Sequence, residues 1–420
     1  MSSQGANNRE SRVMVLAALD TKAAEAVFIC EILRRLGRTP LLVDIGVLGE
    51  AACEPDISSD DVLRRGGATR AELLAGGDRA RVVDTLAAGA EVLARELHRE
   101  GALSAVLALG GSGGTTVGTA AMRQLPLGVP KVMVSTIASG EVQRYVGMKD
   151  ICMLHSVVDF SGVNAISEPI LRNACGAVAG MLAAQDLRRL EPPREARPLI
   201  AASMFGVTTA LIDKAQKLLA QEGYELVPFH ATGIGGRTME TLIDEGVFVG
   251  VLDLTTTEWA DEVVGGTLTA GPTRLEAAAR AGIPQVVAPG ALDIVNFVGP
   301  AGLPEAFRER THHRHNDSVV LLRTTAAECA EIGRRIAEKL SASRGPVTFL
   351  FPRLGISALD RAGAPFFDPA ANEALLGALR AHLSPAITLK VLEAHINDDA
   401  FAEACCRDLL AHLTPRSTHA

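Results

Sequence analysis

The sequence repeats one order of elements, and this repeat constrains its fold more than any other feature. Apolar runs with strand character alternate with amphipathic helical segments, first in one half of the chain and then again in the other. The runs that correspond are 13–19 with 199–204, 40–44 with 225–228, 105–109 with 248–252, and 127–135 with 281–289. Strands that alternate with helices indicate a parallel sheet, and a repeat of this size indicates two similar domains.

A segment rich in proline and charge, residues 190–198, separates the two halves and has the composition of an exposed linker. The length of 420 residues also suits two cores better than one. We therefore predict an α/β protein of two Rossmann-like domains with mainly parallel sheets, related by an internal duplication. The expected N-terminal, nucleotide-binding domain is 1–195 and the C-terminal domain is 196–420.

The composition excludes several classes of protein. Hydrophobic residues make up 48% of the chain and charged residues 21%, so a disordered chain is excluded. The net charge of -8 argues against a dedicated nucleic-acid binder, because such a protein needs a basic surface. No apolar run is long enough to span a membrane, the N-terminus lacks a signal-peptide pattern, and the seven cysteines contain no C-x-x-C pair. We therefore expect a cytoplasmic protein with no membrane partner.

The Gly-rich segment 110–116, Gly-Gly-Ser-Gly-Gly-Thr-Thr, is the strongest candidate for a phosphate-binding loop. It follows an apolar strand and precedes a helix, and its glycines permit positive φ angles, so that successive amides converge on an anion. It matches neither standard phosphate-loop fingerprint. A simple tight turn and a nucleophile elbow, in which Ser112 attacks an acyl carbonyl, stay open as alternatives.

Polar residues at two other strand ends extend this candidate site. Asp20, Thr21 and Lys22 follow the first strand and combine a carboxylate, a hydroxyl and an ammonium, which suit a phosphate with Mg²⁺. Ser135 and Thr136 end a later strand and offer further donors. Helix capping is the alternative interpretation of all five residues.

The second half also carries polar residues where its predicted strands end. His230, Asp253 and Glu258 are candidates for acid or base catalysis, although a role in caps and turns accounts for such residues as well. The run His312-His313-Arg314-His315 resembles a metal cluster, but neighbouring residues point in different directions. We therefore predict a polar loop there and no metal site.

Several longer strings resemble the Tm-1-like ATP-binding family, which is typified by the N-terminal region of a tomato mosaic virus resistance protein and has uncharacterised bacterial members. They include Ala-Leu-Asp-Thr-Lys at 18–22, the glycine loop, Val-Ser-Thr-Ile-Ala-Ser-Gly at 134–140 and Ala-Pro-Gly-Ala-Leu-Asp at 288–293. The resemblance covers nearly the whole chain. It implies two Rossmann-like subdomains, ATP with Mg²⁺ in the first, and a homodimer. The residues that it assigns to the nucleotide site are Asp20, Thr21, Lys22, Gly111, Ser112, Gly113, Gly114, Thr115, Ser135 and Thr136.

The leading hypothesis is thus an ATP-binding protein whose first domain holds the triphosphate. As an enzyme, it is expected to use ATP for phosphoryl transfer or ligation of a small metabolite in the cleft between the domains. The alternatives are a serine hydrolase that uses Ser112 and a non-catalytic nucleotide sensor or interaction module.

Overall fold

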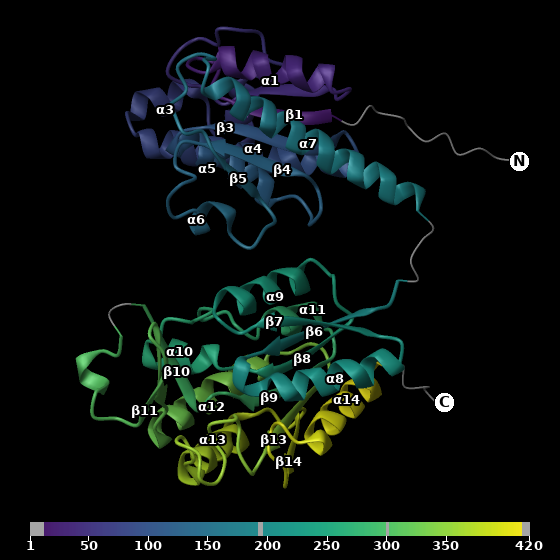
Figure 1. Cartoon of the computed structure of the whole chain (residues 1–420), viewed down its shortest axis with the longest axis vertical. Helices are drawn as coiled ribbons and strands as arrows, with labels where there is room; N and C mark the ends of the chain where they lie inside the picture. Colours follow the sequence, from purple (N-terminus) through teal and green to yellow (C-terminus); the bar gives the residue numbers. More distant parts are fainter. Residues whose placement is uncertain (1–11, 192–195, 300–301, 414–420) are drawn as a thin grey trace, which may run out of the picture. The chain divides into compact units, whose positions relative to one another are not determined.

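The computed structural model describes residues 12–191, 196–299 and 302–413. Contacts divide the chain into two compact units, residues 1–193 and 194–420. Each unit has one parallel sheet with helices on both faces, so the predicted α/β class with two mainly parallel sheets is confirmed (Figure 1). Among the described helices, none is both long and apolar enough to cross a membrane.

The first domain is a five-stranded parallel sheet in the order β2-β1-β3-β4-β5. Its strands are β1 (Arg12–Ala17), β2 (Pro40–Asp44), β3 (Leu103–Gly110), β4 (Lys131–Ser135) and β5 (Cys152–His155). Its helices are α1 (Ala23–Arg35), α2 (Ser59–Arg65), α3 (Arg70–Gly76), α4 (Arg79–Arg99), α5 (Ser112–Arg123), α6 (Gln143–Val146) and α7 (Ser167–Leu190).

Alternation along the strands of this sheet creates two cores. In β1, Met14 and Leu16 face α2 to α5, whereas Val13, Val15 and Ala17 face α1 and α7. Because side chains alternate between the faces of a strand, a strand buried on both sides must be apolar throughout. The uninterrupted apolar runs in the sequence reflect this burial.

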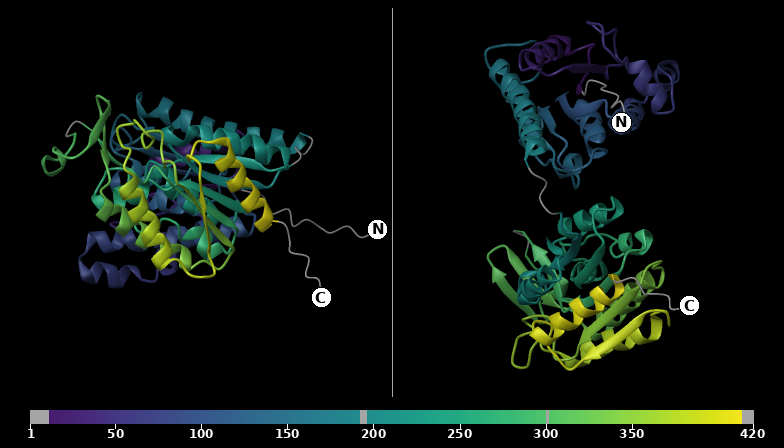
Figure 2. Two further views of the ribbon diagram at one scale, coloured as in Figure 1. Left: turned by 90° about the horizontal axis from the view of Figure 1, so that it is seen from below. Right: turned by 90° about the vertical axis from the view of Figure 1, so that its right-hand side faces the viewer.

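The second domain has a six-stranded parallel sheet in the order β14-β13-β9-β8-β6-β7. Its strands are β6 (Leu199–Met204), β7 (Glu225–His230), β8 (Gly250–Thr255), β9 (Gln285–Gly290), β13 (Val347–Pro352) and β14 (Thr388–Leu392). Helices α8 (Thr209–Gln221) and α14 (Asp399–Leu413) cover one face together (Figures 1 and 2). The other face carries α9 (Ile234–Asp244), α10 (Glu258–Val264), α11 (Ala277–Ala281), α12 (Ala326–Ser341) and α13 (Pro369–His382).

The strand orders confirm the repeat. Read from β7, the second sheet runs β7-β6-β8-β9-β13, which is the order β2-β1-β3-β4-β5 of the first sheet with β14 added at the edge. Each pair of corresponding runs in the sequence therefore occupies equivalent places in the two sheets. This is the doubly wound order in which ligands bind beside the first and third strands.

One local expectation was wrong, and two features of the fold were not predicted. The stretch between β2 and α4 contains α2 and α3; Ser58 caps α2 by accepting a hydrogen bond from the amide of Asp61 at 3.2 Å. The histidine-rich segment is not a loop but strand β11 (His312–Asn316), which pairs with β12 (Val319–Arg323). With β10 (Ile294–Val298), these form a small antiparallel sheet that the repeat does not predict, because nothing in the first half corresponds to it.

Candidate nucleotide site of the first domain

A pocket of about 460 Å³ lies at the carboxyl edge of the first sheet, beside the ends of β1 and β3. In this strand order the chain leaves β1 toward β2, while β3 lies on the opposite side, so the loops that follow β1 and β3 diverge and leave a crevice. We call it the carboxyl-edge pocket. Its lining comes from the segments after β1, β2 and β3, from α3 and α4, and from Asp159.

The start of α5 forms one wall of this pocket. The helix begins at Ser112, after Gly111, and its first helical hydrogen bond runs from the amide of Thr115 to the carbonyl of Gly111 at 2.8 Å. The amides of Ser112, Gly113 and Gly114 come before that bond and donate to no acceptor in the described part of the chain. Free amides at a helix N-terminus attract anions.

The glycines of this segment act differently from the expectation. None of the residues from Gly110 to Gly114 adopts a positive φ, so the conformational freedom that these glycines permit is not used here. Instead, a Cβ at Gly110 would lie 2.8 Å from the Cα of Gly114. A Cβ at Gly118, one turn further on, would lie 2.6 Å from the Cβ of Ala108. These glycines let α5 pack directly against β3, which brings its free amides to the end of the strand.

Lys22 and Asp20 line the same pocket from the end of β1. The ammonium of Lys22 contacts only the hydroxyl of its neighbour Thr21, at 3.2 Å, and pairs with no carboxylate in the described part of the chain. The Oδ2 of Asp20 accepts hydrogen bonds from the amides of Leu48 at 2.9 Å and Gly49 at 3.3 Å. Lys22 is therefore available to an anionic ligand, while Asp20 also holds the loop that follows β2.

Thr115, Ser135 and Thr136 lie outside the lining of this pocket. Thr115 and Ser135 are buried, and their hydroxyl oxygens lie 2.7 Å apart in a hydrogen bond that ties α5 to β4. The structure thus brings together Asp20, Thr21, Lys22 and the segment 111–114, whereas the other three predicted residues support this edge of the sheet.

The opposite wall is apolar and did not feature among the predicted site residues. It includes Val47 after β2, Leu73 of α3, and Val82, Val83 and Leu86 of α4. A sequence signal exists only for the part of this wall at Val47, which lies in the apolar, Gly-rich run after β2, the neighbour of β1 in the sheet. A pocket with free amides and an ammonium on one side and aliphatic side chains on the other suits a ligand with an anionic end and an apolar end.

Asp159 reaches the pocket through a strained turn. Val157 has a φ of 64°, a left-handed conformation that a β-branched residue rarely adopts, and its side chain is exposed. Further along, the amide of Gly162 donates to the buried carboxylate of Glu25 in α1, at 2.8 Å. The loop after β5 is thus tied to α1, and backbone strain of this kind is frequent at functional sites.

The predicted acid and base residues of the second domain lie at the carboxyl edge of its own sheet. Asp253 and Glu258 are buried and both pair with the guanidinium of Arg274, at 2.7 Å for each. The other oxygen of Glu258 accepts from the amides of Gly233 at 2.7 Å and Gly236 at 3.1 Å, so this carboxylate occupies the N-terminus of α9. His230 is exposed, with Phe205 against its ring.

Arg274 is fully buried and was not among the predicted residues. A third carboxylate, that of Glu240, lies 3.1 Å from its guanidinium and accepts hydrogen bonds from the amides of Leu275 and Ala277. Burial raises the pKa of Glu240, although Arg274 opposes this shift. The network connects β8, α9 and α10 with the segment before α11.

Asp261 of α10 gives the stability of the second domain a pH dependence. Burial raises its pKa to about 7, although hydrogen bonds from Asn296 and Leu268 oppose this shift; Glu258 is the charged group that acts on it. Between pH 4 and 7 the folded state therefore retains a proton that the unfolded state has released. The contribution of Asp261 to the free energy of unfolding should fall by about 1–3 kcal/mol as the pH rises from about 5 to 8; Asp293, whose pKa burial also raises to about 7, acts in the same direction.

Fluorescence of Trp259, the one tryptophan of the chain, measures this change in denaturant titrations, because it lies buried in the same helix. Asp261→Asn serves as the matched variant, since its amide has no proton to lose. Asn296 now donates its Nδ2 to Asp261 at 2.8 Å, and its buried Oδ1, which has no partner among the described residues, can accept from the new amide once the Asn296 amide turns over. If the free energy of unfolding changes with pH in Asp261→Asn as it does in the wild type, other groups cause the pH dependence.

Both domains match models of one protein family. Residues 11–187 match the N-terminal domain of an uncharacterised protein family, UPF0261, and residues 197–413 match its C-terminal domain. A UPF0261 protein of Clostridium tetani is 44% identical over 400 residues, which are 95% of this chain and 98% of that protein. A UPF0261 protein of Rhizobium meliloti is 44% identical over 397 residues, 94% of this chain and 97% of that protein.

A plant relative matches as well. The ToMV resistance protein Tm-1 of Solanum lycopersicum is 43% identical over 324 residues, which are 76% of this chain and 42% of the tomato protein. The resemblance to Tm-1-like proteins is therefore confirmed. Together with the matches of both domains, these identities show that the chain belongs to the UPF0261 family.

Proposed function

We propose that the first domain binds ATP, together with Mg²⁺, in the carboxyl-edge pocket. One observation carries this proposal: the free amides of Ser112, Gly113 and Gly114 line the same pocket as the unpaired ammonium of Lys22. Backbone amides at a helix start, aided by a lysine, are a recurring way to hold phosphates. The apolar wall on α3 and α4 is suited to a nucleobase, and the resemblance to an ATP-binding family supports adenine.

The residues present fit a magnesium ion that arrives with its nucleotide. In the described ranges, no three His, Cys, Asp or Glu residues group into a metal site of their own. Asp20 and Asp159 line the pocket, and each has one carboxylate oxygen that accepts no hydrogen bond from described residues. Mg²⁺ is commonly held by one or two carboxylates and by phosphate oxygens, where it neutralises phosphate charge.

The enzymatic form of this proposal is ATP-dependent phosphoryl transfer to a small metabolite, or its ligation. His230, Asp253 and Glu258 remain the candidate bases. Because every carboxylate oxygen of Asp253 and Glu258 accepts hydrogen bonds, His230 is the one most open to a substrate. A cytoplasmic homodimer is part of the same proposal and rests on the family resemblance.

Calorimetric titration of the full chain with ATP, ADP and AMP, each with Mg²⁺, tests the binding step. The affinity should fall from ATP to ADP to AMP, because each phosphate removed takes away charged contacts with the amides and with Lys22. Chelation of Mg²⁺ should weaken ATP binding. If ATP produces neither heat nor thermal stabilisation, or if adenosine binds as tightly as ATP, the proposal is wrong.

A substitution at Ser112 separates nucleotide binding from the alternative of a serine hydrolase. Ser112 is exposed, and its hydroxyl makes no hydrogen bond to a histidine ring in the described part of the chain, where a serine hydrolase places its base. Because the proposal assigns the phosphate contact to the amide of Ser112, Ser112→Ala should change the ATP affinity by less than about threefold. A fluorophosphonate probe should not label the wild-type protein; labelling that Ser112→Ala abolishes would support the hydrolase.

A further inference from the structure

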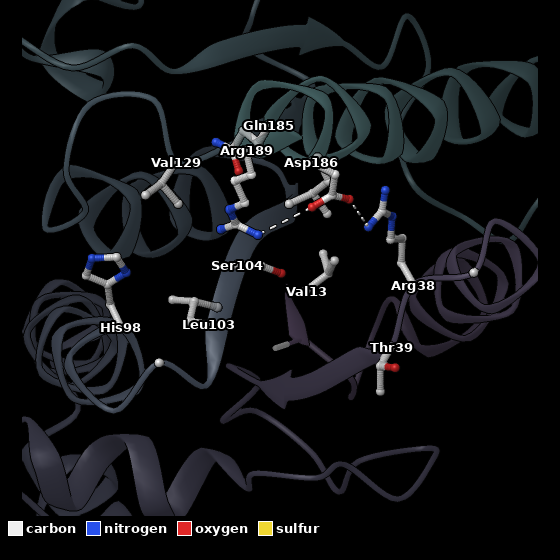
Figure 3. Close-up of a pocket in the computed structure, with 13 residues that line it drawn as sticks. Val13, Arg38, Thr39, His98, Leu103, Ser104, Val129, Gln185, Asp186 and Arg189 are labelled. Carbon is white, nitrogen blue, oxygen red and sulfur yellow. Dashed lines mark hydrogen bonds and ion pairs between the residues drawn. The ribbon is translucent and has the colours of Figure 1, made fainter. Parts of the chain in front are cut away.

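A second pocket, of about 500 Å³, lies at the opposite edge of the first sheet (Figure 3). We call it the amino-edge pocket. Its floor is formed by Val13 at the start of β1 and by Leu103 and Ser104 at the start of β3. Because β1 and β3 also end at the carboxyl-edge pocket, about 15–20 Å of strand separates the two sites. A ligand here does not touch the proposed nucleotide.

Two arginines of this pocket share a single carboxylate. Asp186 of α7 lies 3.2 Å from the guanidinium of Arg38 and 3.4 Å from that of Arg189, and the two arginines approach it from opposite sides (Figure 3). Asp186 is the one acidic residue of the lining. The pocket therefore carries an excess positive charge. The side chain of Arg38 is 25% exposed, so its charge is partly shielded from water and attracts an anion more strongly.

The side away from Arg38 offers uncharged polar groups. The Nδ1 of His98, at the end of α4, is buried and has no hydrogen-bond partner among the residues that the structure describes. Ser104 donates its hydroxyl proton to the carbonyl of Arg12 at 3.1 Å, which leaves its oxygen as an acceptor. In Figure 3, His98 and Arg38 stand on opposite sides of the pocket, with Ser104 between them. A buried, unpaired ring nitrogen costs stability until a ligand satisfies it.

We propose that the amino-edge pocket binds a small organic acid that carries a hydroxyl or amino group. The carboxylate lies with Arg38 and Arg189, as guanidinium groups favour planar carboxylates. The hydroxyl or amino group lies toward His98 and Ser104, and the short carbon chain covers Val13 and Leu103. This site is separate from the proposed nucleotide pocket and does not depend on it.

Without a bound acid, the carboxylate of Asp186 takes the position between the two guanidinium groups that the proposal assigns to the carboxylate of the ligand. A ligand must therefore compete with Asp186 for both guanidinium groups. Removing its charge in Asp186→Asn should strengthen binding by about threefold or more, since the arginines then lack an internal partner. If Asp186 acted only as a structural contact, this substitution would weaken the binding of the acid or leave it unchanged.

Saturation-transfer NMR titrations of the full chain test the proposal with 3-hydroxybutyrate and butyrate, which differ only in the hydroxyl. We expect 3-hydroxybutyrate to bind about fivefold more tightly than butyrate, and His98→Phe to remove that preference. Arg189→Gln should weaken both acids by about two- to fivefold, because its guanidinium is largely exposed to solvent. Arg188→Gln is the matched control, because Arg188 is exposed on the same helix turn but does not line the pocket.

Arg38→Gln provides a second test, with its melting temperature measured to verify that it folds. Several results would overturn the proposal. The first is the absence of saturable binding of either acid up to about 50 mM, a concentration at which even a ligand of six or seven heavy atoms should bind. The second is an equal affinity of Arg189→Gln and wild type for the acids. The third is weaker binding of the acids to Asp186→Asn than to wild type. Inorganic phosphate is the third probe, and phosphate that binds more tightly than both acids in an Arg189-dependent way would contradict the assigned ligand class.

Discussion

Replacing Arg274 with methionine is expected to lower the free energy of unfolding of the second domain by about 3–5 kcal/mol. The substitution leaves the carboxylates of Asp253, Glu258 and Glu240 buried together without their shared countercharge. Methionine has a volume close to that of arginine, so loss of volume contributes little to this effect. Denaturant titrations followed by the fluorescence of Trp259 measure it.

The loss should shrink in acid, because protonated carboxylates no longer repel one another. Arg280→Met is the matched control: this arginine lies six residues along, pairs with Asp244 and Glu276, and is half exposed. We expect it to change the free energy of unfolding by less than about 0.5 kcal/mol. Equal effects of the two substitutions would show that the buried network does not stabilise the domain.

Lys22→Ala should weaken ATP binding by about 1.5–3 kcal/mol, a factor of about 10–150 in the dissociation constant. Among the described residues that line the carboxyl-edge pocket, Lys22 is the one lysine, and its ammonium pairs with no described carboxylate, so its removal deletes a charged hydrogen bond to phosphate. Its one hydrogen bond in the described structure is with adjacent Thr21, so the melting temperature without ligand should hardly change. Calorimetry measures the affinity and a thermal scan the stability.

Lys217→Ala, an exposed lysine of α8, serves as the control for charge and should leave ATP binding unchanged. The charge contribution is also expected to weaken at high salt. If ATP binds the wild type and Lys22→Ala equally well, then Lys22 does not contact phosphate. That result would leave the amides of α5 as the remaining anion site of the pocket.

The repeat in the sequence predicted most of the fold, for a physical reason. Strands buried on both faces must be apolar throughout, so β1, β3 and β4 are visible as continuous runs, and so are their counterparts in the second half. Helices α2 and α3 are only seven residues each, too short for their periodicity to stand out from a polar stretch. Strand β11 is largely exposed, so its polar sequence carried no strand signal.

The phosphate side of the candidate site was also predictable, since strand-end loops of a parallel sheet meet at one edge. This placed Lys22 and Ser112 near each other without a structure. The apolar wall was not predictable in the same way, because Leu73 and Leu86 read as ordinary core residues. Asp159 lies in a loop that is tied to α1 by the hydrogen bond from Gly162 to Glu25. These two residues are 137 positions apart in the sequence, so only the fold shows their contact.

The burial of Arg274 could not be predicted from the sequence for a different reason. In the sequence it stands between Thr273 and Leu275 in a segment with turn character, and nothing there signals complete burial. Its position follows from three carboxylates supplied by β8, α9 and α10, which only the fold brings together. The same contacts bury Asp253 and Glu258, which the sequence offered only as candidate acid or base residues at the strand ends.

The carboxylate of Glu258 has a consequence for how the two halves of the repeat differ. Helix α10 follows β8 as α5 follows β3, so Glu258, the first residue of α10, stands where Ser112 stands in the first half. In the first half this place borders an open pocket, whereas in the second half its side chain accepts from the amides of Gly233 and Gly236 at the start of α9. Those amides are therefore neutralised by the chain itself, without a bound anion.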